Sequence, residues 1–73
     1  MTKKEQIYQN LTDICQKKRE NDRKNEKLYQ NIEKILSFKN PFEQISFEVA
    51  MNILSDLDFS KQQAIELYKQ LVD

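Results

Sequence analysis

The apolar residues of this chain recur at helical spacing, and two similar nine-residue segments stand out. Residues 7–15 read IYQNLTDIC and residues 28–36 read LYQNIEKIL. In each copy the apolar side chains occupy positions i, i+1, i+4, i+7 and i+8, which is the pattern of an amphipathic helix. The copies begin 21 residues apart, or three heptads. One continuous helix would therefore present both apolar stripes to the same partner surface.

The segment between the two copies, residues 16–27, contains no apolar residue. In the favoured interpretation, residues 3–37 form one long helix with a polar middle, supported by opposite-charge pairs such as Glu20 with Lys24. In the alternative, the chain turns near residues 20–23 and the two copies pack face to face as a helical hairpin. Neither Gly nor Pro marks that turn, so only Asn and Asp would support it.

Two further helices are predicted after the sequence FKNPFEQ. Pro41 disfavours helical geometry at the preceding residue and suits the first turn of a new helix. That helix is expected over residues 41–57 with Asn40 as its N-cap, and its wide apolar arc indicates a helix that is covered on two sides. Ser60 and Gln63 then form a capping box that begins the last helix.

The fold class predicted from these patterns is all-α. We expect a long N-terminal amphipathic, coiled-coil-like helix or a helical hairpin over residues 1–39. A two-helix segment follows over residues 40–73, and the whole chain makes one folded unit. A core of this size rarely supplies more than about 3–5 kcal/mol, and Cys15 has no second cysteine with which to form a disulfide. We therefore expect a dimeric helical bundle, and specifically a homodimer.

The composition argues against catalysis and metal binding. Histidine, the commonest general base, is absent, and so is the glycine that phosphate-binding loops need. Cys15 aligns with Leu36 in the repeat, which predicts a small buried apolar residue. Asp56 and Asp58 resemble the start of a calcium loop, but Lys61 stands where such a loop requires Gly. We expect a protein that is not an enzyme, with no catalytic residue, no cofactor and no metal site.

The charges are distributed unevenly along a chain whose formal net charge is zero. Residues 1–40 carry a net charge of +4 and residues 41–73 carry −4. The basic segment 17–27 supports an alternative function, that of a dimeric nucleic-acid-binding regulator, although interleaved acids weaken it and the chain as a whole is not basic. Its candidate nucleic-acid contacts are Lys17, Lys18, Arg19, Arg23, Lys24 and Lys27.

The chain contains no sign of membrane targeting. No stretch approaches the roughly 18 consecutive apolar residues of a membrane span. The first ten residues, MTKKEQIYQN, lack the apolar run of a signal peptide. We expect a cytoplasmic protein that does not bind a membrane.

The function predicted is that of a non-enzymatic protein–protein interaction module, acting as a regulator, an inhibitor or an assembly adaptor. Tyr8 and Tyr29 each place an aromatic ring with a polar tip at the edge of an apolar stripe, a combination that is frequent at interfaces. An isolated helix of this kind gains little from propensity alone, so its stability should depend on packing of that stripe. The residues expected at the protein interface are Ile7, Tyr8, Leu11, Ile14, Leu28, Tyr29, Ile32 and Ile35.

Overall fold

A computed structural model describes residues 2–72, and their regular secondary structure is entirely helical. The prediction of an all-α fold is confirmed. The chain divides into two compact units, residues 1–38 (unit 1) and residues 39–73 (unit 2). That the two units fold as one remains a prediction. Within the described residues, no helix is both long and apolar enough to cross a membrane.

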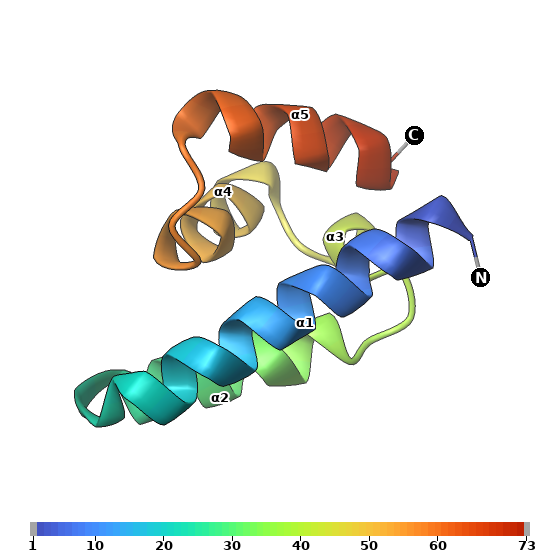
Figure 1. Ribbon diagram of the computed structural model, residues 1–73. Coiled ribbons are helices and arrows are strands. Elements are labelled where there is room, and N and C mark those ends of the chain that lie inside the picture. The colour runs from blue at the N-terminus through green and yellow to red at the C-terminus, as the bar shows by residue number, and fades with distance from the viewer. Residues whose placement is uncertain (1, 73) are drawn as a thin grey trace. The chain divides into compact units, whose positions relative to one another are not determined.

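Unit 1 is a helical hairpin (Figure 1). Helix α1 (Lys3–Asn21) ends before Asp22, a short 3-10 helix η1 (Arg23–Asn25) follows, and α2 (Glu26–Leu36) returns alongside α1 in the opposite direction. The favoured prediction of one continuous helix over residues 3–37 is therefore wrong. The chain instead adopts the arrangement that was the alternative.

The turn between α1 and α2 depends on Asp22 and Asn25. Asp22 leaves helical geometry, with φ −131° and ψ 85°, while its backbone N–H still donates to the Lys18 carbonyl at 2.8 Å. The side-chain amide of Asn25 donates to a carboxylate oxygen of Asp22 at 2.8 Å. Such local side-chain hydrogen bonds offer the backbone an alternative to helix, which explains how the chain turns without Gly or Pro.

The hairpin is held together by the two repeated stripes. Leu11 and Cys15 of α1 and Tyr29, Ile32 and Leu36 of α2 are buried. Leu11 and Ile32 occupy the same position in the two copies of the repeat, as do Cys15 and Leu36. The thiol of Cys15 also donates to the Tyr29 carbonyl at 3.2 Å. The hairpin forms because each stripe removes the other from water, which a continuous helix could not achieve within one chain.

Unit 2 contains three helices, α3 (Pro41–Gln44), α4 (Phe47–Asp56) and α5 (Lys61–Val72), and α5 packs against both of the others (Figure 1). The predicted single helix over residues 41–57 is wrong, because the chain leaves helical geometry after α3. Ile45 is extended, with φ −120° and ψ 160°. Helix α4 then begins anew.

The break between α3 and α4 has a local cause in Ser46. Its side chain accepts a hydrogen bond from the backbone N–H of Val49 at 3.2 Å, as an N-cap does. A serine inside a helix gains no such bond, so a cap at this position competes with continuation of the helix. The apolar pattern across residues 41–57 concealed this signal.

The start of α3 also differs from the prediction. Asn40 has a left-handed backbone, with φ 49° and ψ 59°, and its side chain makes no capping hydrogen bond. Its carbonyl accepts from the Glu43 backbone N–H at 3.1 Å, and the side chain of Gln44 donates to the Lys39 carbonyl. Asn40 therefore occupies the N-cap position, as predicted, but its side chain does not cap the helix. Asparagine suits this position because it tolerates a left-handed backbone better than most residues do.

The turn between α4 and α5 is fixed at both ends by hydrogen bonds. After α4, Asp58 has a positive φ of 71°. The Phe59 backbone N–H donates a hydrogen bond to the Leu54 carbonyl at 3.0 Å. Before α5, the Ser60 backbone N–H donates to Gln63 Oε1 at 3.1 Å, and the Gln63 backbone N–H donates to Ser60 Oγ at 3.2 Å. The predicted capping box is therefore confirmed.

The core of unit 2 draws on all three helices and on the turn after α4. Ala50, Ile53 and Leu54 are buried on the inner side of α4, while its first turn keeps large apolar side chains exposed. The expectation of a helix fully covered on two sides therefore fails at the start of α4. The other buried apolar side chains of unit 2 are Pro41, Phe42, Leu57, Ala64 and Leu71.

We expect the thiol of Cys15 to report the opening of the hairpin. In the folded chain this thiol is fully buried, so a water-soluble disulfide reagent should reach it only when α1 and α2 separate. Ile32→Ala, which removes a buried side chain at a cost of about 2–5 kcal/mol, should raise the rate of thiol modification at least about tenfold. Asn31→Ala, at an exposed neighbouring position, serves as the control. A wild-type thiol that reacts as fast as in denaturant would contradict the hairpin core.

Candidate protein-binding surfaces

The residues predicted at a protein interface are divided by the hairpin into buried and accessible ones. Leu11, Tyr29 and Ile32 are buried within the protomer, so a partner would reach them only if α1 and α2 separated. Leu28 is 39 % exposed. The remaining predicted interface residues are half-buried, namely Ile7, Tyr8, Ile14 and Ile35.

An apolar groove in unit 2 lies between α4 and α5, and sequence reasoning did not find it. Phe47, at the start of α4, is 49 % exposed. Its ring stands edge-on to Tyr68 of α5, with 5.0 Å between centroids and 84° between planes. The groove has a volume of about 280 Å³. Its lining comprises Phe47, Met51, Asn52, Ser55, Phe59, Lys61, Ala64 and Ile65.

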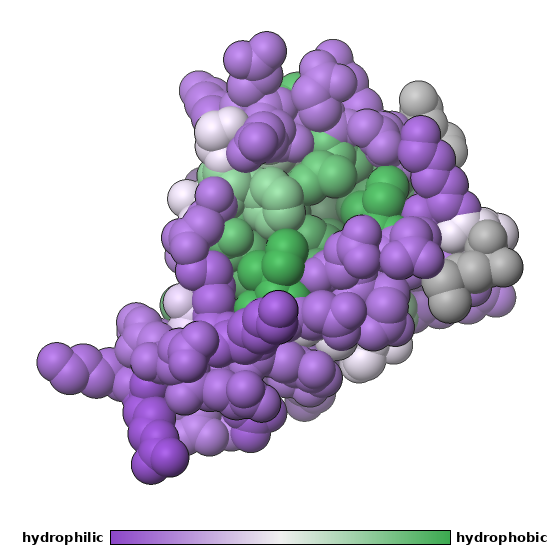
Figure 2. Space-filling view, viewed as in Figure 1, coloured by the Kyte–Doolittle hydropathy of each residue, from purple (hydrophilic) through white to green (hydrophobic). Residues whose placement is uncertain are grey.

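Figure 2 shows hydrophobic residues gathered beside α4 and below α5 in this view. On α4 the groove side chains recur at spacings of four residues, Phe47, Met51 and Ser55, which places them on one face. Phe59, from the turn between the helices, also lines the groove. An exposed apolar surface of this kind is typical of an interaction site.

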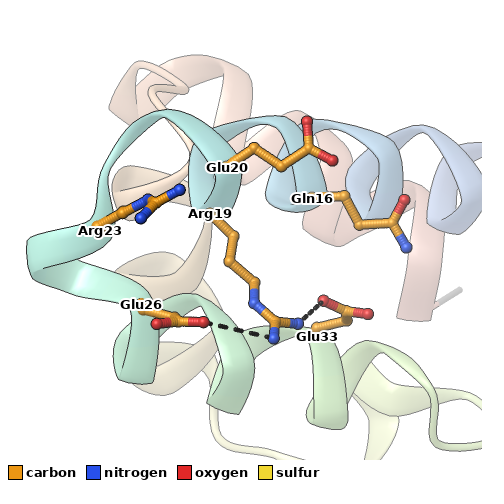
Figure 3. A pocket seen from close by; sticks show the side chains of 6 residues that line it. All are labelled: Gln16, Arg19, Glu20, Arg23, Glu26 and Glu33. Atoms are coloured by element: carbon orange, nitrogen blue, oxygen red, sulfur yellow. Dashed lines mark hydrogen bonds and ion pairs between the residues drawn. The ribbon is translucent and has the colours of Figure 1, made fainter.

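A second, charged hollow occurs at the turn end of the hairpin (Figure 3). Arg19, near the end of α1, reaches across to two carboxylates of α2, with Nη2 3.6 Å from Glu26 Oε1 and Nη1 3.4 Å from Glu33 Oε2. These side chains are partly exposed, so the ion pairs contribute little to stability. Gln16, Glu20 and Arg23 complete the lining, which contains no apolar side chain. The hollow therefore offers no anchor for an apolar group.

The residues predicted to contact nucleic acid lie toward the same end of the hairpin. Four of them, Lys17, Arg23, Lys24 and Lys27, are exposed, and within residues 2–72 none of these four makes an ion pair. Lys18 and Arg19 are half-buried, and the guanidinium of Arg19 is engaged by the two glutamates described above. Because of the turn, these cations come from α1, η1 and α2, which the sequence pattern of a single helix did not predict.

The environment of Cys15 does not favour a reactive thiol. Burial raises the pKa of Cys15 above its usual value, and the negative charge of Glu33 raises it further. A hydrogen bond from the Glu33 backbone and the positive charge of Arg19 lower the pKa and offset part of this rise. Because the thiolate is the nucleophile and the metal ligand, a buried thiol with a raised pKa is suited to packing.

Nothing in the described part of the chain forms a metal centre. Across residues 2–72, no three side chains of the His, Cys, Asp and Glu types lie close enough together to hold a metal ion. The chain matches no protein-family model, no curated protein and no solved structure in comparisons with each.

Proposed function

We propose that the protein is a small helical protein–protein interaction module, which acts as a regulator, an inhibitor or an assembly adaptor. The observation that carries the proposal is the apolar groove between α4 and α5 with Phe47 at its edge. Exposing half of a phenylalanine forfeits burial of apolar surface that would otherwise stabilise the fold. A partner that covers the ring would recover that free energy.

The size and lining of the groove favour a side chain of another protein over a small molecule. Pockets for drug-sized ligands usually have volumes of about 300–1,000 Å³ and enclose most of the ligand. The groove falls just below that range and lies open between two helices. Phe47 and Phe59 supply rigid aromatic surface, and Met51 supplies a flexible thioether that adapts to different apolar shapes.

We also propose that the protein is not an enzyme and that it acts in the cytoplasm. The absence of histidine removes the commonest general base, and the buried thiol of Cys15 lacks the low pKa of a nucleophile. The location is supported by that single unpaired cysteine, since proteins of oxidising compartments commonly carry disulfides.

We propose in addition that the protein is a weak homodimer through the outer face of α2, where part of the predicted stripe stays accessible. Leu28 is 39 % exposed and Phe38, after the helix end, is 42 % exposed. Half-buried Ile35 lies one heptad after Leu28, so these side chains recur as in a coiled-coil seam. Stable interfaces bury about 1,200–2,000 Å² in total, and a face with so few apolar residues supports only a weak association.

A capture experiment tests the protein-binding proposal. The immobilised full chain is exposed to lysate of the source cell, and the retained proteins are quantified. Phe47→Ser should lower the yield of the specific partner at least about tenfold, as expected for an aromatic residue that supplies much of the binding free energy. Val49→Ser is the matched control, because Val49 is 40 % exposed on the same helix and does not line the groove. Equal capture by the Phe47 variant, with its helical content preserved, would refute the proposal.

Sedimentation velocity tests the homodimer. Leu28→Asp should shift the concentration-dependent equilibrium fully to monomer, because the substitution places a charge in the apolar seam. Gln30→Asp adds the same charge at an exposed position away from the seam and should leave the equilibrium unchanged. A wild-type chain that stays monomeric at its highest soluble concentration would show the dimer proposal to be wrong.

The alternative function is binding of nucleic acid by a dimer, and the four exposed cations that make no ion pair within residues 2–72 favour it. If Lys17, Arg23, Lys24 and Lys27 each neutralise one phosphate, affinity for duplex DNA should fall with salt at a logarithmic slope of about −3.6. Replacing any one of them by Gln should reduce the slope by about 1. Lys34→Gln, near the other end of α2, is the control. An absence of binding at low salt would eliminate this function.

A further inference from the structure

We infer that the groove between α4 and α5 takes a peptide segment that presents one or two bulky apolar side chains next to a single carboxylate. The inference rests on the proposed protein-binding function and adds the chemistry of the partner. Three observations carry it: the composition of the groove lining, the state of its one charged residue, and the net charge of unit 2.

The lining of the groove predicts that the partner presents an apolar side chain. Phe47, Met51, Phe59 and Ile65 together form an apolar surface around a volume of about 280 Å³. The edge-on contact of Phe47 with Tyr68 holds the Phe47 ring in place while leaving it 49 % exposed. A space of this size admits one or two aromatic or branched aliphatic side chains and excludes a whole helix. Such anchors usually contribute most of the affinity of a protein interface.

The prediction of a carboxylate in the partner comes from Lys61, which is the only charged residue among the described residues that line the groove. Lys61 is exposed at the first position of α5. Within the described residues its ammonium makes no ion pair. The opposite wall offers only the neutral polar groups of Asn52 and Ser55. A carboxylate beside the apolar anchor would therefore find a cation without competing with an acid of this chain.

The restriction to one carboxylate follows from the wider charge of unit 2. Residues 39–73 carry three lysines and six acidic residues, a net charge of −3. Among the described residues none of those acids lines the groove, but the acids of unit 2 that lie within a Debye length disfavour a peptide with several acidic residues. Lys61 acts at contact distance, where screening by salt is weak. A peptide segment with a single acidic residue is attracted by Lys61 and is repelled only weakly by the acidic residues of unit 2.

The test is selection of a random twelve-residue phage-displayed peptide library on the immobilised full chain. Enriched peptides should carry Trp, Phe, Leu, Ile or Met with one Asp or Glu within a few residues. Synthetic copies of the best peptide are then titrated against variants by fluorescence anisotropy. Phe47→Ser should weaken binding at least about tenfold, and Lys61→Glu should weaken it about two- to fivefold, as for an exposed ion pair.

Charge reversal separates a specific contact with Lys61 from a general effect of charge. A copy of the peptide in which the acidic residue is replaced by Lys should bind Lys61→Glu more tightly than it binds the wild-type chain. Lys69→Glu makes the same change on α5 at an exposed residue outside the groove lining and should have little effect. Because Glu is favourable in the first turn of a helix, Lys61→Glu should fold normally.

Three results would overturn the inference: failure to enrich any peptide, enrichment without an acidic residue, or equal binding by the wild-type and Lys61→Glu chains. The proposed function is judged separately by capture of a partner with the Phe47→Ser and Val49→Ser variants. A partner lost only with Phe47→Ser, combined with an unaffected Lys61→Glu variant, would uphold the groove and reject the carboxylate.

Discussion

The architecture of unit 1 depends on the burial of one apolar stripe against its own repeat. A 19-residue helix and an 11-residue helix, each polar on most of its surface, are marginal in isolation. Packing Leu11 and Cys15 of the first copy with Ile32 and Leu36 of the second gives both helices a dry face. The turn at Asp22 is the local cost of this arrangement, and hydrogen bonds between Asp and Asn side chains offset part of it.

The same packing rearranges the charges of the chain. Because α2 runs back alongside α1, charged residues of the two helices become neighbours. Arg19 of α1 lies within ion-pair distance of Glu26 and Glu33 of α2. Arg19 thereby differs from its exposed basic neighbours, because its guanidinium already has anionic partners. A basic run in a sequence therefore overstates the positive charge available for binding, since neutralisation depends on residues distant along the chain.

In unit 2 a single capping hydrogen bond has a large effect on the surface. Ser46 starts α4 two residues after α3 has ended. Phe47 then stands in the first turn of α4, half exposed and edge-on to Tyr68, where continuation of α3 would have given it another orientation. Phe47, in the first turn of the restarted helix, lines the groove between α4 and α5. Lys61 in the lining would favour a partner with a carboxylate, a preference that an apolar surface alone would not have.

The sequence by itself determined the features that depend on neighbouring residues. Helical periodicity and the absence of Gly settled the all-α class, and Ser60 with Gln63 settled the start of α5, because a capping box closes within one turn. The repeat also indicated that Cys15 is buried. Only the tertiary structure decided whether the two stripes face each other or an external surface, and which interface residues remain accessible. Periodicity specifies the apolar face of a helix, but the surface that covers this face is set by contacts between distant parts of the chain.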